Sequence, residues 1–143
     1  MEIRIRRGRR TDYAALAALG AWPTVDGSPA RSVRLFRRVA ADLAYDLYVA
    51  DDGEGLVGLV AVSYVRALAL GGQRATLEQL IVRPDHRGCG LGRRLAEFVL
   101  ARAERRGAVA IEARPEDEIA ERFLDHLGFR SRGRRYTWTK DSS

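Results

Sequence analysis

Residues 77–92 read Leu77-Glu78-Gln79-Leu80-Ile81-Val82-Arg83-Pro84-Asp85-His86-Arg87-Gly88-Cys89-Gly90-Leu91-Gly92. A mostly apolar run leads into a Pro-Asp turn and then into three alternating glycines that precede a helical pattern. The first N–H groups of a helix are unpaired and carry partial positive charge. Glycines have no side chain, so a phosphate can approach those groups closely. The stretch therefore predicts a strand, a turn and an anion-binding loop that would accept a pyrophosphate.

The glycine pattern taken alone is weak evidence, because glycines also serve tight turns and close helix–sheet packing. The loop lacks the lysine and the hydroxyl of a nucleoside-triphosphate P-loop. It also follows a late strand rather than the first one, unlike a dinucleotide-binding fingerprint. These two departures exclude the commonest phosphate-binding motifs.

Upstream of the loop, hydrophobic periodicity and turn residues predict four strands and two helices. The strands are expected at residues 2–6, 45–50, 56–64 and 75–82, and the helices at about 11–20 and 30–42. A loop is expected at 22–29, and Asp51-Asp52-Gly53-Glu54-Gly55 predicts a hairpin turn because its glycines tolerate positive φ.

Downstream, a helix is expected at about 91–105, followed by a strand at 109–113. Pro115 opens a last helix, in which Ile119, Phe123 and Leu127 fall on one stripe, and Gly128 suits its C-terminal end. A final strand is expected from Phe129 through residues 136–138. The order of elements predicts a single domain over residues 1–143, with one mixed α/β (α+β) sheet and helices on both of its faces.

Composition fits this interpretation, since 143 residues with 46% hydrophobic and 31% charged side chains suit one globular domain. The net charge of +6 has two interpretations, a nucleic-acid surface or the attraction of an anionic small ligand. The arginines are scattered along the chain and mostly lie beside acids. No recognition helix, RNA-binding strand motif or zinc-ligand spacing is present in the sequence. We therefore do not expect nucleic acid or a metal ion as a partner.

Cellular location is constrained by three observations. The longest apolar stretch begins at Leu56 and ends at Arg66, far short of a membrane span. The N-terminus alternates charged and apolar residues and has no signal-peptide block. The lone cysteine, Cys89, cannot form an internal disulfide. These features predict a cytoplasmic location without a membrane partner.

The quoted stretch resembles the signature of the GNAT superfamily of N-acyltransferases, Arg/Gln-x-x-Gly-x-Gly/Ala, with Arg87, Gly90 and Gly92 at the fixed positions. The strand at 77–82, the ending at 120–129 and the opening strand with the helix at Thr11-Asp12 are also similar. The resemblance is weakest from 21 to 44. It implies a GNAT-like mixed, mostly antiparallel sheet of six to seven strands with about four helices on both faces.

The same resemblance implies an N-acetyltransferase. Such an enzyme moves an acetyl (acyl) group from acetyl-CoA to a primary amine of a small molecule or protein, by direct attack in a ternary complex. The partners are then acyl-CoA, used as a cosubstrate without a metal, and an amine acceptor whose identity the sequence leaves open. A homodimer is compatible with the resemblance.

The resemblance also implies which residues bind the cofactor. Backbone groups of Leu80, Ile81 and Val82, near a bulge, would pair with the pantetheine arm as an added strand does. Backbone amides of seven residues would hold the pyrophosphate: Arg87, Gly88, Cys89, Gly90, Leu91, Gly92 and Arg93. Cys89 is interpreted as part of this loop rather than as a nucleophile. Asp117 occupies a position where many relatives use Asn or Ser to touch the cofactor, so its acidic side chain is a departure.

Catalysis requires a neutral amine, and an alkylammonium with a pKa near 10.4 is neutral in only about one molecule in 2,500 at pH 7. The resemblance implies Glu78 as the general base, while the competing interpretation is an exposed carboxylate or a salt bridge to an arginine. Leu124 stands where many relatives have a tyrosine general acid. Tyr64, Tyr136 and His126 are substitutes with no motif behind them. The missing tyrosine motivates an alternative function, a noncatalytic acyl-CoA sensor.

Overall fold

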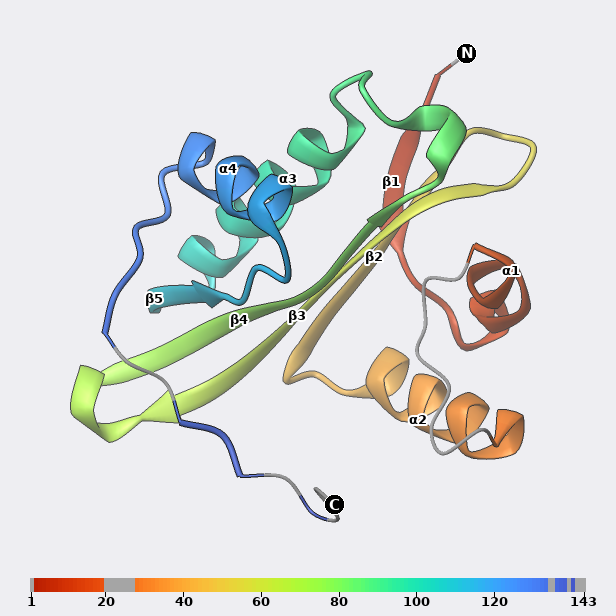
Figure 1. The fold of residues 1–143 in the computed structure, drawn as a ribbon. Helices are drawn as coiled ribbons and strands as arrows, with labels where there is room; N and C mark the ends of the chain where they lie inside the picture. Colours follow the sequence, from red (N-terminus) through yellow and green to blue (C-terminus); the bar gives the residue numbers. More distant parts are fainter. Residues whose placement is uncertain (1, 20–27, 134–135, 139, 141–143) are drawn as a thin grey trace.

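A computed structural model describes residues 2–19, 28–133, 136–138 and 140 (Figure 1). In chain order the main elements are β1 (Arg4–Arg7), α1 (Tyr13–Ala18), α2 (Pro29–Ala41), β2 (Tyr45–Asp51), β3 (Leu56–Ala67), β4 (Gly72–Val82), α3 (Leu91–Arg105), β5 (Ala108–Ala113) and α4 (Glu118–His126). Three short 3₁₀ helices lie between them, η1 (Arg10–Asp12), η2 (Leu68–Leu70) and η3 (Pro84–His86). None of the helices within these ranges has the length and apolar character that a membrane span requires. The expected loop at 22–29 falls largely outside the described residues.

Over the described residues the sheet has five strands in the order β1-β2-β3-β4-β5, so the expectation of six to seven strands was wrong. The first three pairings are antiparallel and the β4–β5 pairing is parallel. The expected final strand is missing, because residues 129–133 and 136–138 belong to no strand. Gly133 has a φ of 65°, which interrupts an extended backbone. Tyr136 and Trp138 are 90% and 86% exposed, so neither aromatic side chain packs as a strand residue would.

Two helical layers cover the two faces of this sheet, as expected (Figure 1). The period-2 alternation of β2 and β3 sends successive side chains to opposite faces. On the face covered by α1 and α2, a buried cluster is formed by Leu16, Phe36, Leu47, Val49, Leu56, Leu59 and Ala61. The face covered by α3 holds a second cluster, which includes Val57, Val60, Val62, Leu91, Leu95 and Val99. The sheet therefore separates two cores, and each can support a different surface.

Helix α3 lies close to the sheet because β3 has a glycine at the point of contact. A Cβ added to Gly58 would lie 3.0 Å from Leu95 Cδ1 and 3.2 Å from the carbonyl oxygen of Ile81. Any side chain at this position would push α3 away from the strands. Gly58 pairs with Val82, the last residue of β4, so the close packing fixes α3 beside the end of that strand.

A buried carboxylate ties α3 to β2 and β3. Asp46 is fully buried on the α3 face and accepts a hydrogen bond from the Tyr64 hydroxyl at 2.6 Å. It also accepts from the guanidinium groups of Arg102 and Arg106 at 3.2 and 3.1 Å. Burial opposes ionisation of Asp46, but these donors and charges outweigh it and lower its pKa. Burial, followed by the hydrogen bond to Asp46, raises the pKa of Tyr64.

Candidate functional site

Strand β4 changes its partners halfway along its length. Ala61 and Val62, adjacent on β3, pair with Gln79 and Leu77, so Glu78 is the extra residue of a β-bulge. The parallel pairing with β5 ends at Leu77 opposite Ala113. Beyond that point the described part of the chain gives β4 only one strand partner, β3. Residues 78–82, including the predicted cofactor contacts Leu80, Ile81 and Val82, therefore lie on an open sheet edge that can accept an extended polar chain.

The glycine loop begins where this edge ends. Gly88 and Gly90 have φ values of 81° and 84°, which non-glycine residues rarely adopt. Gly90 is the N-cap of α3 and no side chain caps that helix, so its first-turn N–H groups have no side-chain partner. A Cβ on Gly92 would lie 3.7 Å from Val82 Cγ2 and 3.9 Å from the Phe123 ring, so α3 starts against β4 and α4. The loop thus has positive-φ glycines and a helix start without a side-chain cap, and its binding of an anion stays a prediction.

The structure gives the other predicted cofactor residues definite contacts. Arg87 Nε donates to the Val82 carbonyl oxygen at 3.2 Å, which joins the loop to the open edge. Arg93 pairs with Glu97 at 3.6 Å. Asp117 is the N-cap of α4, where its carboxylate accepts from the Ala120 N–H at 2.7 Å. The capping contact accounts for an acidic residue at this position.

We expect Gly90→Ala to lower the affinity for coenzyme A about tenfold, because a methyl group strains the left-handed backbone and displaces the amides of the loop. Calorimetric titration with coenzyme A measures this effect. Gly107→Ala is the matched control, since Gly107 has a φ of 86° at the far end of α3. It should cost similar stability, about 1 kcal/mol, and leave the affinity within twofold. Equal losses of affinity in both variants would contradict a role for the loop.

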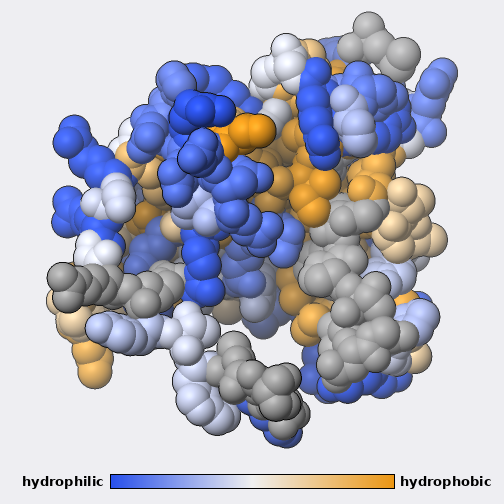
Figure 2. Space-filling model, in the orientation of Figure 1, coloured by the Kyte–Doolittle hydropathy of each residue, from blue (hydrophilic) through white to orange (hydrophobic). Residues whose placement is uncertain are grey.

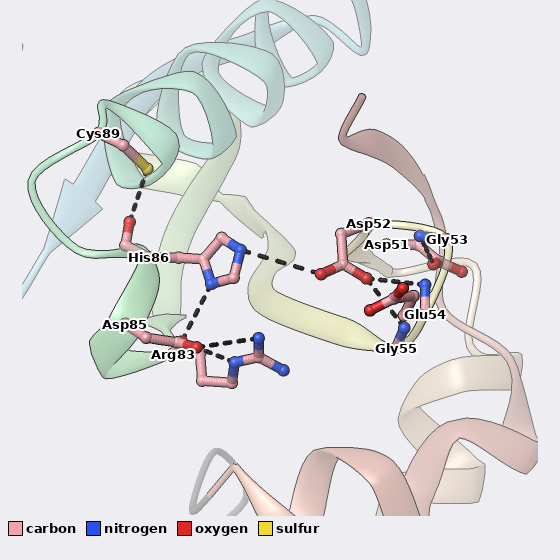
Figure 3. A network of polar contacts seen from close by, with 9 residues as sticks. All are labelled: Asp51, Asp52, Gly53, Glu54, Gly55, Arg83, Asp85, His86 and Cys89. Atoms are coloured by element: carbon pink, nitrogen blue, oxygen red, sulfur yellow. Dashed lines mark hydrogen bonds and ion pairs between the residues drawn. The ribbon is translucent and has the colours of Figure 1, made fainter. Parts of the chain in front are cut away.

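A polar network connects the loop to the β2–β3 hairpin (Figure 3). His86 Nδ1 lies 3.0 Å from Asp85 Oδ1, and its Nε2 lies 3.9 Å from Asp52 Oδ2 in the hairpin. The Cys89 thiol donates to the His86 carbonyl oxygen at 2.7 Å. Hydrogen bonds from Arg83 and then His86 lower the pKa of Asp85 to about 2. Backbone N–H groups of the hairpin lower the pKa of Asp52, so both carboxylates beside His86 are charged near neutral pH.

His86→Ala should weaken coenzyme A binding about two- to fivefold, because it removes a support of the loop without removing any of its amides. The chain has two histidines, and His126 lies exposed on α4. His126→Ala therefore serves as the control and should leave the dissociation constant unchanged. Both constants are read from the same calorimetric titration. A His86→Ala protein that bound as tightly as the control would show that the network has no influence on the loop.

A cavity of about 550 Å³ opens where β4 and β5 separate. Its polar lining side chains come from both strands and from the connection to α4: Arg74, Thr76, Glu78, Glu112, Arg114 and Glu116. Leu77 and Ala113, the last paired residues of the two strands, complete the lining. Figure 2 shows hydrophilic side chains over most of α4, the helix that follows. Glu78 therefore belongs at once to the bulge, to the start of the open edge and to the cavity.

Strand register extends the polar surface of this cavity across the sheet. Tyr45 pairs with Ser63, Ser63 with Thr76 and Thr76 with Glu112, so these four side chains form one row across β2, β3, β4 and β5. The row lies on the face covered by α1 and α2. Leu47 and Ala61, which belong to the buried cluster of that face, lie two residues from Tyr45 and Ser63 and therefore point the same way. Burial, and then the charges of Glu78 and Asp42, raise the pKa of Tyr45. Tyr45 therefore lies within electrostatic reach of Glu78.

The three suggested general acids lie in different places. The Tyr64 hydroxyl is on the α3 face and donates to Asp46, so it is committed to the core. Tyr136 is exposed, and His126 Nδ1 lies 2.7 Å from the Arg122 carbonyl oxygen at the end of α4. The sequence pointed to none of Tyr45, Glu112, Arg114 or Glu116. Strand register brings Tyr45 and Glu112 to the site, and the connection after β5 brings Arg114 and Glu116.

Comparisons with known proteins agree with this architecture. The family model described as "Acetyltransferase (GNAT) family" matches residues 15–129. Among solved structures, the chain is similar to a transcriptional regulator from Bacillus halodurans C-125, at 25% identity and a TM-score of 0.82, over 97% of this chain and 100% of that one. No curated protein matches the chain.

Two further solved structures share the fold. One is ribosomal-protein-alanine N-acetyltransferase from Brucella melitensis biovar Abortus 2308, at 18% identity and a TM-score of 0.74, over 97% of this chain and 100% of that one. The other is aminoglycoside N-acetyltransferase AAC(6')-Iy in complex with CoA, at 18% identity and a TM-score of 0.82, over 98% and 95% of the two chains. At these identities the likeness concerns the fold alone.

Proposed function

The chain belongs to the acetyltransferase (GNAT) family, and from that premise we propose that it acts as a single-domain N-acetyltransferase, transferring an acetyl group from acetyl-CoA to a primary amine. One observation carries the proposal. The open edge of β4 runs from a carboxylate at a bulge, Glu78, to an uncapped helix start at Gly90. An extended molecule with an anionic end and a reactive end fits these two features together.

The residues divide into a binding set and a reacting set. Backbone groups of Leu80, Ile81 and Val82 bind the pantetheine arm, and the amides of residues 87–93 bind the pyrophosphate. This arrangement places the thioester near the bulge. Glu78 then faces the acceptor in the cavity between β4 and β5. Asp117 caps α4, and its implied contact with the cofactor stays a prediction.

The transfer balances as follows. An alkylammonium first gives one proton to Glu78, directly or through water, and becomes a neutral nucleophile. Its nitrogen forms a bond to the acetyl carbon as the carbon–sulfur bond breaks, and the electron pair of that bond leaves with the coenzyme A thiolate. The nitrogen, now bonded to the acetyl carbon, loses its second proton to solvent as the amide forms. The thiolate takes a proton from solvent, because Leu124 cannot donate one.

Two measurements test this function. Acetyl-CoA should raise the melting temperature, since a ligand that binds only the folded state stabilises it. Acetyl-CoA with a panel of primary amines should release free thiol in proportion to acetylated amine. A shift in melting temperature without thiol release for any amine would favour the alternative, an acyl-CoA sensor that lacks a general acid. Neither a shift nor release would refute both.

A further inference from the structure

The acceptor cavity differs in charge from the rest of the protein. The chain as a whole carries a net charge of +6. In the cavity, by contrast, three carboxylates, Glu78, Glu112 and Glu116, face two guanidinium groups, Arg74 and Arg114. A fourth acid, Asp42, lies near the same polar row, since its charge acts on Tyr45. A basic surface attracts an anionic cosubstrate, whereas an acidic cavity attracts a cation.

The carboxylates of the cavity are poorly neutralised within the described part of the chain. No hydrogen bond or ion pair joins Glu78 or Glu116 to another described residue. Glu112 lies 3.3 Å from Arg74 Nε, and the two side chains are 41% and 39% exposed, so this pair contributes little to stability. Arg74 Nε is itself buried without a hydrogen-bond partner, which shows that the pair is badly aligned. Because the pair is not a hydrogen bond, the Glu112 carboxylate can still accept from an ammonium group in the cavity.

The separation of the two strand positions that carry Glu78 and Glu112 limits the size of the ligand. Glu112 pairs with Thr76, and Glu78 follows Thr76 by two residues on the same face of the sheet. With a rise of about 3.3 Å per residue and a strand separation of about 4.8 Å, the Cα atoms of Glu78 and Glu112 lie on the order of 8 Å apart. Two amino groups joined by four or five carbons span such a distance.

We propose that this cavity selects an acceptor with two amino groups, one beside Glu78 for acetylation and a second, still protonated, held by Glu112. The inference rests on the proposed transfer to an amine and specifies its substrate class. The lining side chains are all charged or hydroxylated apart from Leu77 and Ala113. These two residues pair with each other, and their side chains point to the α3 face of the sheet, away from the polar row. The cavity therefore favours a hydrophilic polyamine over an arylamine or an alkyl monoamine.

The test compares 1,4-diaminobutane and 1,5-diaminopentane with 4-amino-1-butanol, which replaces the second ammonium by a hydroxyl. We expect kcat/KM, measured by thiol release, to be about tenfold higher for the diamines, since a charged hydrogen bond replaces a neutral one. Glu112→Gln should reduce this ratio to near one. Glu104→Gln removes the same charge from an exposed position on α3 and should keep the full ratio. Equal kcat/KM for all three amines in the wild type, or a ratio that survives Glu112→Gln, would overturn the inference.

Calorimetric binding of 1,4-diaminobutane to the protein saturated with coenzyme A separates this inference from the proposed function. Binding that depends on Glu112, without thiol release for any amine, would support the cavity assignment and refute the transfer. Thiol release that is equal for every amine would support the transfer and refute the cavity assignment. Neither binding nor release would refute both.

Discussion

Glu78→Gln should lower kcat/KM for acetyl transfer by about 10²- to 10³-fold, while the dissociation constant for acetyl-CoA changes by less than twofold. The substitution keeps the size of the side chain and the bulge but removes the proposed general base, and such groups contribute about 10²- to 10⁴-fold to rates. The loss should shrink at high pH. Below the amine pKa of about 10.4, each rise of one pH unit increases the fraction of neutral amine about tenfold, so the reaction depends less on a general base. Steady-state thiol release from pH 7 to 10 measures both effects.

Glu104→Gln provides the control, since Glu104 lies exposed on α3 and outside the cavity. It should retain full activity across the same pH range. If the Glu78→Gln enzyme were as active as this control at every pH, Glu78 would not be the general base. This outcome would not affect the proposal that the glycine loop binds the cofactor.

Asp46→Asn should destabilise the protein by about 3 kcal/mol and lower its melting temperature by about 10 °C. The buried carboxylate compensates the charges of Arg102 and Arg106, whose side chains are only partly exposed, and an amide leaves both without a counter-ion. Urea unfolding measures the change. Asp125→Asn, at an exposed position on α4, should stay within about 0.5 kcal/mol. A loss of less than 1 kcal/mol for Asp46→Asn would show that the network does not hold α3 on the sheet.

The same substitution should alter the dependence of stability on pH. The folded-state pKa of Asp46 is lowered from the ordinary value of about 3.9, so its contribution is present above that value and is lost as pH falls through the folded pKa. Asp12 behaves alike: burial opposes its ionisation, but the hydrogen bonds from Arg6 and the Arg9 N–H outweigh burial and lower the pKa. Wild type and Asp46→Asn should therefore differ in unfolding free energy much more at pH 7 than near pH 2.

Local sequence predicted the centre of the fold well and its end poorly. The strand, turn, glycine loop and helix from Leu77 to Arg105 were predicted correctly, because a proline or a glycine lies at or near each boundary. Strands β3 and β4 extend further toward their hairpin than expected, to Ala67 and from Gly72, since pairing between them continues past charged residues. The prediction of a final strand was wrong, because the alternation of aromatic side chains at Tyr136 and Trp138 does not show whether a partner strand is available.

The candidate site was also predicted only in part, because a single sequence shows local patterns but not contacts between distant residues. The proposed cofactor loop is contiguous, so a motif can point to it, and the bulge at Glu78 lies near the strand residues where the resemblance implied one. The cavity is assembled by register between β4 and β5, and a one-residue shift would turn Glu112 to the opposite face. His86 and Asp52 meet only because the β2–β3 hairpin folds beside η3. Such long-range juxtapositions leave no local pattern in a single sequence.

The division of the interior into two clusters, one on each side of a shared sheet, means that the two substrates of the proposed reaction would impose separate demands on the sequence. Replacements along the row Tyr45, Ser63, Thr76 and Glu112 leave untouched the residues that seat α3 and its glycine loop. Under the proposed function, a descendant of this protein could thus acquire a new acceptor by exchanging a few half-buried strand residues of this row, while keeping the same acyl donor.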